Sequence, residues 1–294
     1  MFERPAIRLL PDGKRLLLQE GPIELVIQAV GDSAPVQAAY EAAARRFEGL
    51  LAELCGELAL LRRPVTARSP VPAGVVARRM HAAVSPFAAT IFITPMAAVA
   101  GSVAEEILGA MVAAGPLRRA FVNNGGDIAL HLAEHEQFRV GLVDRPDRPT
   151  LFAETVIVAE HGVRGIATSG YPGRSFSRGI AEAVTVLAPR AAMADAAATV
   201  IANAVDLPGH PAVIRVPASA IQSDSDLGDM PVTREVGQLS RDEIEQAIAS
   251  GLTEAARLLE RGLIKSCAIH LQGESRTLAL DAFTKTTTGE LLHA

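Results

Sequence analysis

The stretch AFVNNGGDIALHL, residues 120–132, constrains the fold of this chain more than any other feature. Its centre, NNGGD at 123–127, lies between two apolar runs that are typical of strands, and Asn-Gly supports the positive φ angles of a two-residue hairpin. Strands joined this closely pair antiparallel, whereas parallel strands need a long crossover. The stretch therefore predicts an antiparallel sheet.

The rest of the chain shows long helical patterns set beside further strand-like runs. Strands are predicted at residues 6–10, 14–19, 24–30, 87–94, 118–123, 127–133, 137–143, 154–160, 163–168, 183–188, 264–271 and 276–281. Helices are predicted at residues 33–60, 75–84, 95–114, 191–205 and 240–261, with a long polar loop at 218–236. This order indicates an α+β fold rather than regular β-α-β alternation.

Several helix starts carry recognisable capping residues. Ser33 is predicted to cap the first long helix, and Thr94-Pro95 supplies a cap followed by a first-position proline. Ser240, with Glu243 three residues later, matches a capping box. The helix that begins at 95 is rich in small residues, which suits either tight helix packing or a role facing a ligand.

Composition limits the fold and the partners. With 294 residues and 49% hydrophobic content, the chain can bury a large core, as one domain over 1–294 or as two intertwined halves. The alanine-rich segments TPMAAVAGSVA and PRAAMADAAATV hint at an internal duplication. A net charge of -5 argues against nucleic acid or an anionic membrane as partner. A small-molecule partner is expected, and a homodimer stays open.

The N-terminal residues, the apolar window and the two cysteines bear on the location of the protein. The opening MFERPAIRLL lacks the pattern of an export signal, so a cytoplasmic location is expected. The apolar window 88–115 is interrupted by polar and charged residues, which indicates a buried strand and a buried helix rather than a membrane span. Cys55 and Cys267 lie far apart and are expected to be reduced, buried thiols.

One metal motif is set aside on its context. His131, Glu134 and His135 match the HxxEH pattern of inverted zincins, but the segment alternates like two strands joined in a hairpin with His135-Glu136 at its tip. In a strand the two imidazoles would be about 13 Å apart, too far to share one zinc ion. Walker, dinucleotide-binding GxGxxG and GxSxG motifs are absent from the sequence.

Two corners that combine glycine with polar residues remain as candidate binding loops. NNGGD at 123–127 suits a turn, yet its glycines could also offer backbone N–H groups to a phosphate. Thr168, Ser169 and Gly170 close a predicted strand, and Arg174 follows with a side chain able to bind phosphate. Each also fits an ordinary turn with a solvated arginine.

A third candidate lies on the helix predicted at 191–205. Asp195 and Thr199 are four residues apart and so share one helix face, where their oxygens could hold a hard cation such as Mg²⁺. The alternative is an aspartate and a threonine that bond to the helix backbone.

Taken together, VNNGGDIAL, IATSG and AVTVLAPRAAMADAAATVIANAV resemble the ApbE superfamily of flavin-nucleotide-binding proteins, over about residues 94–206. The residues of these motifs look most like those of an uncharacterised branch of ApbE-like proteins. The resemblance implies duplicated, T-fold-related α+β halves with antiparallel sheets and long helices. It also implies FAD in a cleft between the halves, with Mg²⁺ near the diphosphate.

The resemblance assigns roles to individual residues. Asp195 and Thr199 match the metal-binding pair of the family's A-D-A-x-A-T helix. The cofactor-binding positions that match the family's GGD and T-S-G corners, with the neighbouring basic residue, are Asn124, Gly125, Gly126, Asp127, Thr168, Ser169, Gly170 and Arg174.

The departures concern the chemistry of transfer. The family's flavin transferases carry a lysine in a G-I-A-K-G helix start, whereas residues 98–101 here contain none. Their H-I-x-D-P-x-T-G segment is replaced by SFSRGIAE at 175–182, so a histidine and an aspartate have no counterpart. The resemblance thus implies an FAD- and Mg²⁺-binding protein whose action on the FAD diphosphate, by FMN transfer or hydrolysis, is in doubt. A flavin carrier or sensor, or a protein of another cofactor pathway, are the alternatives.

Overall fold

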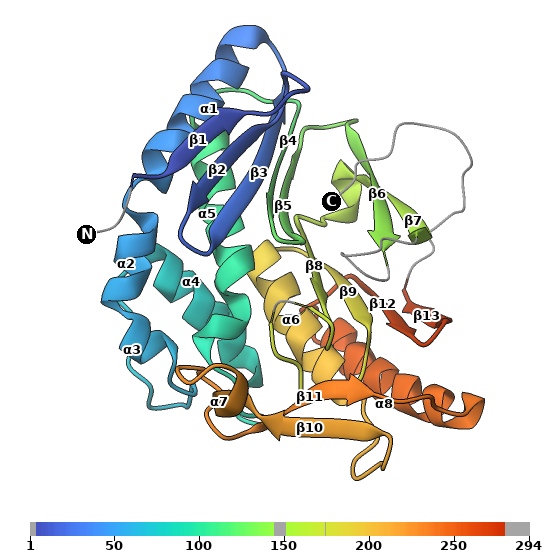
Figure 1. Cartoon of the computed structure of the whole chain (residues 1–294). Coiled ribbons are helices and arrows are strands. Elements are labelled where there is room, and N and C mark those ends of the chain that lie inside the picture. Colours follow the sequence, from blue (N-terminus) through green and yellow to red (C-terminus); the bar gives the residue numbers. More distant parts are fainter. Residues whose placement is uncertain (1–3, 144–150, 174, 280–294) are drawn as a thin grey trace. The chain divides into compact units, whose positions relative to one another are not determined.

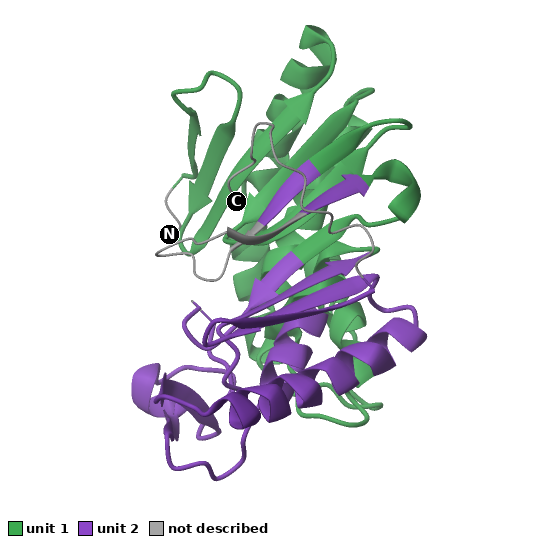
Figure 2. Ribbon diagram, turned by 90° about the vertical axis from the view of Figure 1, so that its right-hand side faces the viewer, with its two compact units in different colours: residues 1–138, 158–166, 189–195 green, residues 139–157, 167–188, 196–294 purple. Residues whose placement is uncertain are grey.

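A computed structural model describes residues 4–143, 151–173 and 175–279 (Figure 1). The chain folds into two compact units, and each unit gathers segments that are distant in sequence (Figure 2). The first contains Met1–Phe138, Val158–Ile166 and Pro189–Asp195. The second contains Arg139–Ile157, Ala167–Ala188 and Ala196–Ala294.

The first unit is built on an antiparallel sheet covered by helices. In spatial order its strands are β1 (Ala6–Leu9), β2 (Leu16–Glu20), β3 (Ile23–Val30), β4 (Arg119–Asn124), β5 (Asp127–Leu132) and the start of β8 (Gly165–Ser169). Its helices are α1 (Ser33–Phe47), α2 (Leu50–Gly56), α3 (Leu58–Leu61), α4 (Val75–Val84) and α5 (Val99–Ala113). Short 3₁₀ turns lie at Ser85–Phe87, Pro95–Ala98 and Ala159–His161.

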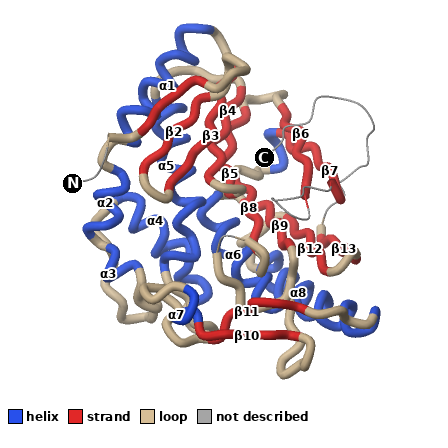
Figure 3. The backbone as a smooth tube through the Cα atoms, viewed as in Figure 1, coloured by secondary structure: helices blue, strands red, loops and turns tan. Residues whose placement is uncertain are grey.

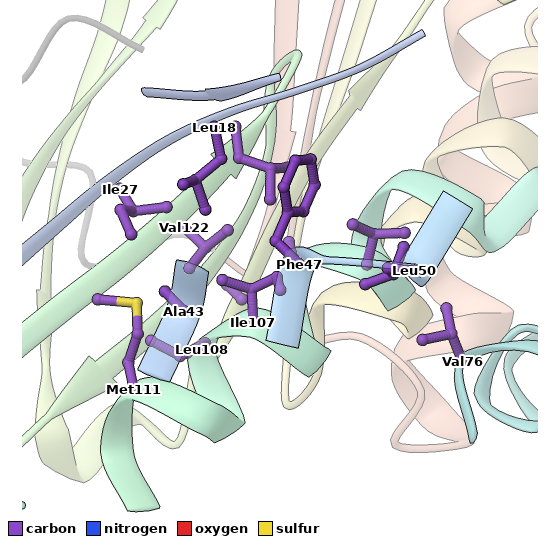
Figure 4. Close-up of a cluster of buried hydrophobic side chains, with 14 of the residues drawn as sticks. Leu18, Ile27, Ala43, Phe47, Leu50, Val76, Ile107, Leu108, Met111 and Val122 are labelled. Carbon is purple, nitrogen blue, oxygen red and sulfur yellow. The ribbon is translucent and has the colours of Figure 1, made fainter. Parts of the chain in front are cut away.

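The core of this unit lies between the sheet and the helices. Every second residue of β3 is buried, as expected for a strand with one face on a core. The side chains that fill the space come from strands and helices alike, including Leu18, Ile27, Phe47, Ile107 and Val122 (Figure 4). Burial of these large apolar groups is the main force that holds α1 and α5 on the sheet.

The second unit has its own strands and one long helix. The end of β8, β9 (Ala183–Ala188), β12 (Ser266–Leu271) and β13 (Glu274–Leu278) follow one another in the sheet. Two separate pairs are β6 (Gln137–Val143) with β7 (Leu151–Val158) and β10 (Val213–Pro217) with β11 (Pro231–Val236). Helix α8 (Arg241–Glu260) packs on β12 and β13, and α7 (Ala218–Ile221) follows β10.

Three predictions for the first unit are wrong. The helix expected at 33–60 is divided, because Gly49 adopts a left-handed φ of 78° between α1 and α2. Ser33 is the first residue of α1 rather than its cap, and Asp32 in the capping position makes no side-chain bond. The strand expected at 87–94 is a turn, since the N–H groups of Thr90 and Ile91 both donate to the carbonyl of Phe87.

Three further expectations are corrected. The polar loop expected at 218–236 contains α7 and β11 (Figure 3), because backbone pairing with β10 orders it. β5 and β6 are joined by a turn at 134–135, but within the described chain they pair with other strands and form no hairpin. Cys55 is exposed, whereas Cys267 is buried and burial raises the pKa of its thiol to about 12.

The apolar helix of the first unit is a core element. Among the described residues, the segment Pro95–Ala113 is the one helical stretch long and apolar enough, by length and composition alone, to cross a membrane. Its side chains Val103, Ile107 and Met111 are fully buried in the cluster beneath the sheet. The predicted buried helix is therefore confirmed, and its start is the part that matters for the site.

Candidate functional site

A row of side chains across the first unit's sheet changes from apolar to polar at the β4–β5 turn. Leu18, Leu25, Asn124 and Asp127 lie directly opposite one another on β2, β3, β4 and β5. Paired residues point to the same face of a sheet, and both leucines belong to the core beneath the helices. Asn124 and Asp127 therefore lie on the helix-covered face, at the end of that core.

The turn between these two residues has the predicted geometry. Gly125 and Gly126 have φ angles of 67° and 110°, as a two-residue hairpin of this kind requires. The N–H of Gly126 donates to Oδ1 of Asn123 at 2.8 Å. The hairpin is confirmed, and one of the two glycine N–H groups already has a partner within the turn.

Asn124 connects the turn to the start of α5. Its Nδ2 donates to the carbonyl oxygen of Ala100 at 3.1 Å. Upstream, Thr94 caps the 3₁₀ turn by accepting from the N–H of Met96, with Pro95 next, as predicted. α5 itself begins after Ala98, which has no side-chain acceptor to offer. The N–H of Val99 donates to the carbonyl of Met96, whereas the next N–H groups of α5 need a partner from elsewhere.

That partner is Asp195, far away in sequence. Its Oδ2 accepts the N–H of Gly101 at 2.9 Å. Burial raises the pKa of this half-buried carboxyl to about 7, against the opposing effect of hydrogen bonds from the backbone of Gly101 and Ala100. Within the described residues, no arginine, lysine or histidine forms an ion pair with it. Asp195 is thus a poorly solvated acid that lacks a counter-cation.

Glycines bring the two helices into backbone contact here. A Cβ added at Gly101 or at Gly165 would lie closer than 3.0 Å to the backbone of Ala191, near the start of α6 (Ala191–Ala204). No side chain larger than hydrogen fits at either position. The helix-packing interpretation of the small residues is confirmed for Gly101, and this packing lets Asp195 reach the α5 backbone.

Thr199 follows Asp195 one turn along α6. The helix passes from the first unit into the second between residues 195 and 196, and its periodicity keeps these two side chains on one face. The described part of the chain contains no group of three or more His, Cys, Asp or Glu side chains suited to a metal. His131, from the HxxEH pattern, instead contacts the carbonyl of Leu117 through Nε2. The metal role of Asp195 and Thr199 stays a prediction.

The T-S-G corner belongs to the second unit. Thr168 is exposed, and its hydroxyl lies 2.9 Å from that of Thr185 on the neighbouring strand. Gly170 is buried, and an added Cβ there would overlap the carbonyl of Glu182. Ser169 is half-buried, and Arg174 lies outside the described residues. Close backbone packing accounts for Gly170, while ligand binding by this corner stays a prediction.

The backbone groups at this site leave little trace in the sequence. The sequence predicts Asp195 as a cation ligand, but its bond to Gly101 spans almost a hundred residues and leaves no local pattern. The sequence predicts a helix from residue 95 with Thr94 as its cap, so it does not show that α5 begins only after Ala98, where no side chain caps it.

A family model described as AbpE bacteria matches residues 7–277. Among curated relatives, a UPF0280 protein of Methanopyrus kandleri is 40% identical over 144 residues, which cover 47% of this chain and 54% of the relative. A UPF0280 protein of Methanosphaerula palustris is 41% identical over 123 residues, which cover 38% and 46%. The chain spans about half the length of these curated relatives.

Solved structures with a similar course of the chain are also known. The ApbE protein of Thermotoga maritima is 11% identical with a TM-score of 0.44, over 94% of this chain and 96% of that one. The flavin transferase ApbE of Vibrio cholerae is 12% identical with a TM-score of 0.38, over 97% and 100%. The match to the family model, which covers most of the chain, is the finding that assigns the family.

Proposed function

Because the chain belongs to the family described as AbpE bacteria, we propose that it binds a flavin nucleotide, FAD together with Mg²⁺. The observation that carries the proposal is the Asp195 carboxyl, which is poorly solvated, lacks an ion-pair partner and is fixed at the start of a long helix. A poorly solvated acid without a counter-cation is stabilised either by a proton or by a bound cation.

The side chains near Asp195 suit a hard cation. In the first unit, Asn124 and Asp127 at the ends of β4 and β5 carry oxygen atoms as possible ligands, and the resemblance to the family adds Thr199, one turn after Asp195 along α6. Mg²⁺ takes oxygen ligands and is commonly held by one or two carboxylates plus substrate phosphates. A bound Mg²⁺ would neutralise charge on the FAD diphosphate.

The chain's own part in this site is mainly to hold and orient. Asp195 keeps one oxygen on the N–H of Gly101, while Asn124 fixes the neighbouring carbonyl of Ala100. Both bonds restrain the start of α5, so the carboxylate is held in one orientation before a ligand arrives. A carboxylate oriented in advance loses less conformational entropy on binding.

One observation favours binding without transfer. The helix start that would carry the transferase lysine has none, and Gly101 in that stretch admits no side chain because Ala191 packs against it. Loss of that lysine, and of the H-I-x-D-P segment, removes groups that would position the reacting phosphate. A flavin carrier or sensor is therefore the second candidate function.

Calorimetric titration with FAD, with and without Mg²⁺, tests the proposal on three proteins: the wild type, Asp195→Asn, and Glu106→Gln as a half-buried acid elsewhere on α5. Mg²⁺-dependent binding that only Asp195→Asn loses supports the site. No binding by the wild type under either condition removes the flavin from the function. A parallel assay for release of FMN and AMP separates an enzyme from a carrier.

A further inference from the structure

A second acidic side chain, Glu105, contacts the helix that carries Asp195. Glu105 is four residues after Gly101 on α5, so both lie on the face toward α6. Its Oε1 accepts the N–H of Ala192, the second residue of α6, at 3.0 Å. The side chain is 13% exposed, so this bond is largely shielded from water.

Two arginines hold the other carboxylate oxygen of Glu105. Nη2 of Arg190 lies 2.9 Å from Oε2, and Nε of Arg79 lies 3.1 Å from the same atom. Arg79 also donates to the carbonyl of Ser102 at 3.0 Å, which ties it to the first turns of α5. Charge-assisted bonds from two guanidinium groups fix the orientation of Glu105.

The two helices therefore cap each other. Asp195 of α6 accepts a backbone N–H from the first turn of α5, and Glu105 of α5 accepts one from the first turn of α6. Ala191 is packed against Gly101 at the centre of this exchange. Any displacement of the start of α6 would move Asp195, because the two bonds are one helical turn apart on a rigid element.

We propose that Glu105 is a positioning residue for the cation site: by holding the first turn of α6 on α5, it fixes the Asp195 carboxylate where a divalent cation would bind. Glu105 itself does not touch the cation. This inference rests on the proposed function of Asp195, but its structural part can be measured without any ligand.

The test compares Glu105→Ala and the milder Glu105→Gln with Glu106→Ala. Glu106 is a matched control because it is the adjacent residue, is 14% exposed and also binds Arg79, yet the arginines that it binds lie on α1 and α4 rather than near α6. Hydrogen exchange of backbone amides at 99–102 and 189–196 reports on the helix starts. Titration with FAD at several Mg²⁺ concentrations reports on the site.

Glu105→Ala should speed exchange at Ala192 and Gly101 and weaken Mg²⁺-dependent FAD binding by about tenfold, the usual order for loss of a residue that supports a metal ligand. Glu105→Gln, which keeps an acceptor for Ala192, should lie between it and the wild type. Glu106→Ala should lower the stability of the protein in urea, but it should change neither amide exchange at Ala192 and Gly101 nor Mg²⁺-dependent FAD binding.

The inference would be overturned if Glu105→Ala left amide exchange at Ala192 and Gly101 unchanged, or if Glu106→Ala lost as much protection and FAD affinity as Glu105→Ala. It would also be overturned if Glu105→Ala exchanged faster but kept the Mg²⁺ dependence of FAD binding. If the wild type binds no FAD, the proposed function fails instead. Exchange at Ala192 and Gly101 then still decides whether Glu105 holds the two helix starts together.

Discussion

The first backbone N–H groups of α8 and of α5 both need hydrogen-bond acceptors, and the two helices obtain them from different places. At α8, Ser240 and Glu243 cap the helix within three residues: the Ser240 hydroxyl accepts from the N–H of Glu243, whose carboxylate accepts the N–H of Ser240 at 2.7 Å. At α5, the acceptor is Asp195, brought from a distant helix. A local cap stabilises one helix, whereas a distant cap fastens two parts of a fold together.

The pKa values of the acids in these two caps are shifted in opposite directions. Hydrogen bonds from the backbone and hydroxyl of Ser240 lower the pKa of the exposed Glu243 to about 2. Burial raises the pKa of Asp195 to about 7 although it also accepts backbone N–H bonds. An exposed acid is stable as an anion in water, while a buried one is relieved by a proton or a cation. This difference marks α5, rather than α8, as the place to look for a ligand.

The largest expected effect on stability comes from a side chain placed between α5 and the start of α6, where the two backbones are in contact. Gly101→Ala should lower the free energy of unfolding by about 3 kcal/mol, because its Cβ would overlap the carbonyl of Ala191. Gly109→Ala is the matched control on α5: no atom lies within 4 Å of its added Cβ, so it should be neutral or slightly stabilising. Urea unfolding measures both, and equal effects would refute the close helix contact.

The second effect is a pH dependence with a definite sign. Asp195 has a pKa of about 7 in the folded chain and an ordinary value of 3.8. Between these values the folded chain binds more protons than the unfolded one, so stability should fall as pH rises from about 4 to about 7, by on the order of 2 kcal/mol between pH 5 and pH 7 alone. Asp195→Asn should lack this component in urea unfolding at pH 5 and pH 8. An identical pH profile in the variant would show that Asp195 does not titrate as described.

The smallest effect is expected at the local cap. Ser240→Ala should lower the free energy of unfolding in urea by about 1 kcal/mol, the usual value for a lost helix cap, and should leave FAD binding unchanged. The dependence of stability on pH has the opposite sign at this cap, because Glu243 contributes stability above pH 4.5 that is lost as pH falls toward 2. A loss of Mg²⁺-dependent binding in Ser240→Ala would break the contrast between the two helix starts.

The same contrast explains what the sequence could predict. The capping box of α8, the Thr94-Pro95 start and the NNGGD hairpin depend on neighbours in sequence, and all three are confirmed. The break at Gly49 was missed because an isolated glycine inside a helical pattern does not reveal its φ. The apolar run at 87–94 predicts a strand, yet it does not pair with a sheet: Phe87 and Ile93 are buried, while Ile91 is exposed.

The candidate site shows the same limit. Its polar residues Asn124, Asp127 and Asp195 could be named from the sequence by their resemblance to a family, but the bonds to Ala100 and Gly101 could not. Those bonds depend on how α5, α6 and the sheet of the first unit pack, which is set by long-range apolar contacts. The role of Glu105 was equally invisible, since its partner Ala192 is a backbone group.

The most direct test of the account is the pKa of Asp195, measured by carboxyl ¹³C NMR with and without Mg²⁺. Without Mg²⁺ the account predicts a pKa near 7. With saturating Mg²⁺ the pKa should fall well below 7, because a cation bound at the carboxylate favours its charged form. A pKa that Mg²⁺ leaves unchanged would contradict the assignment of a cation to the start of α5.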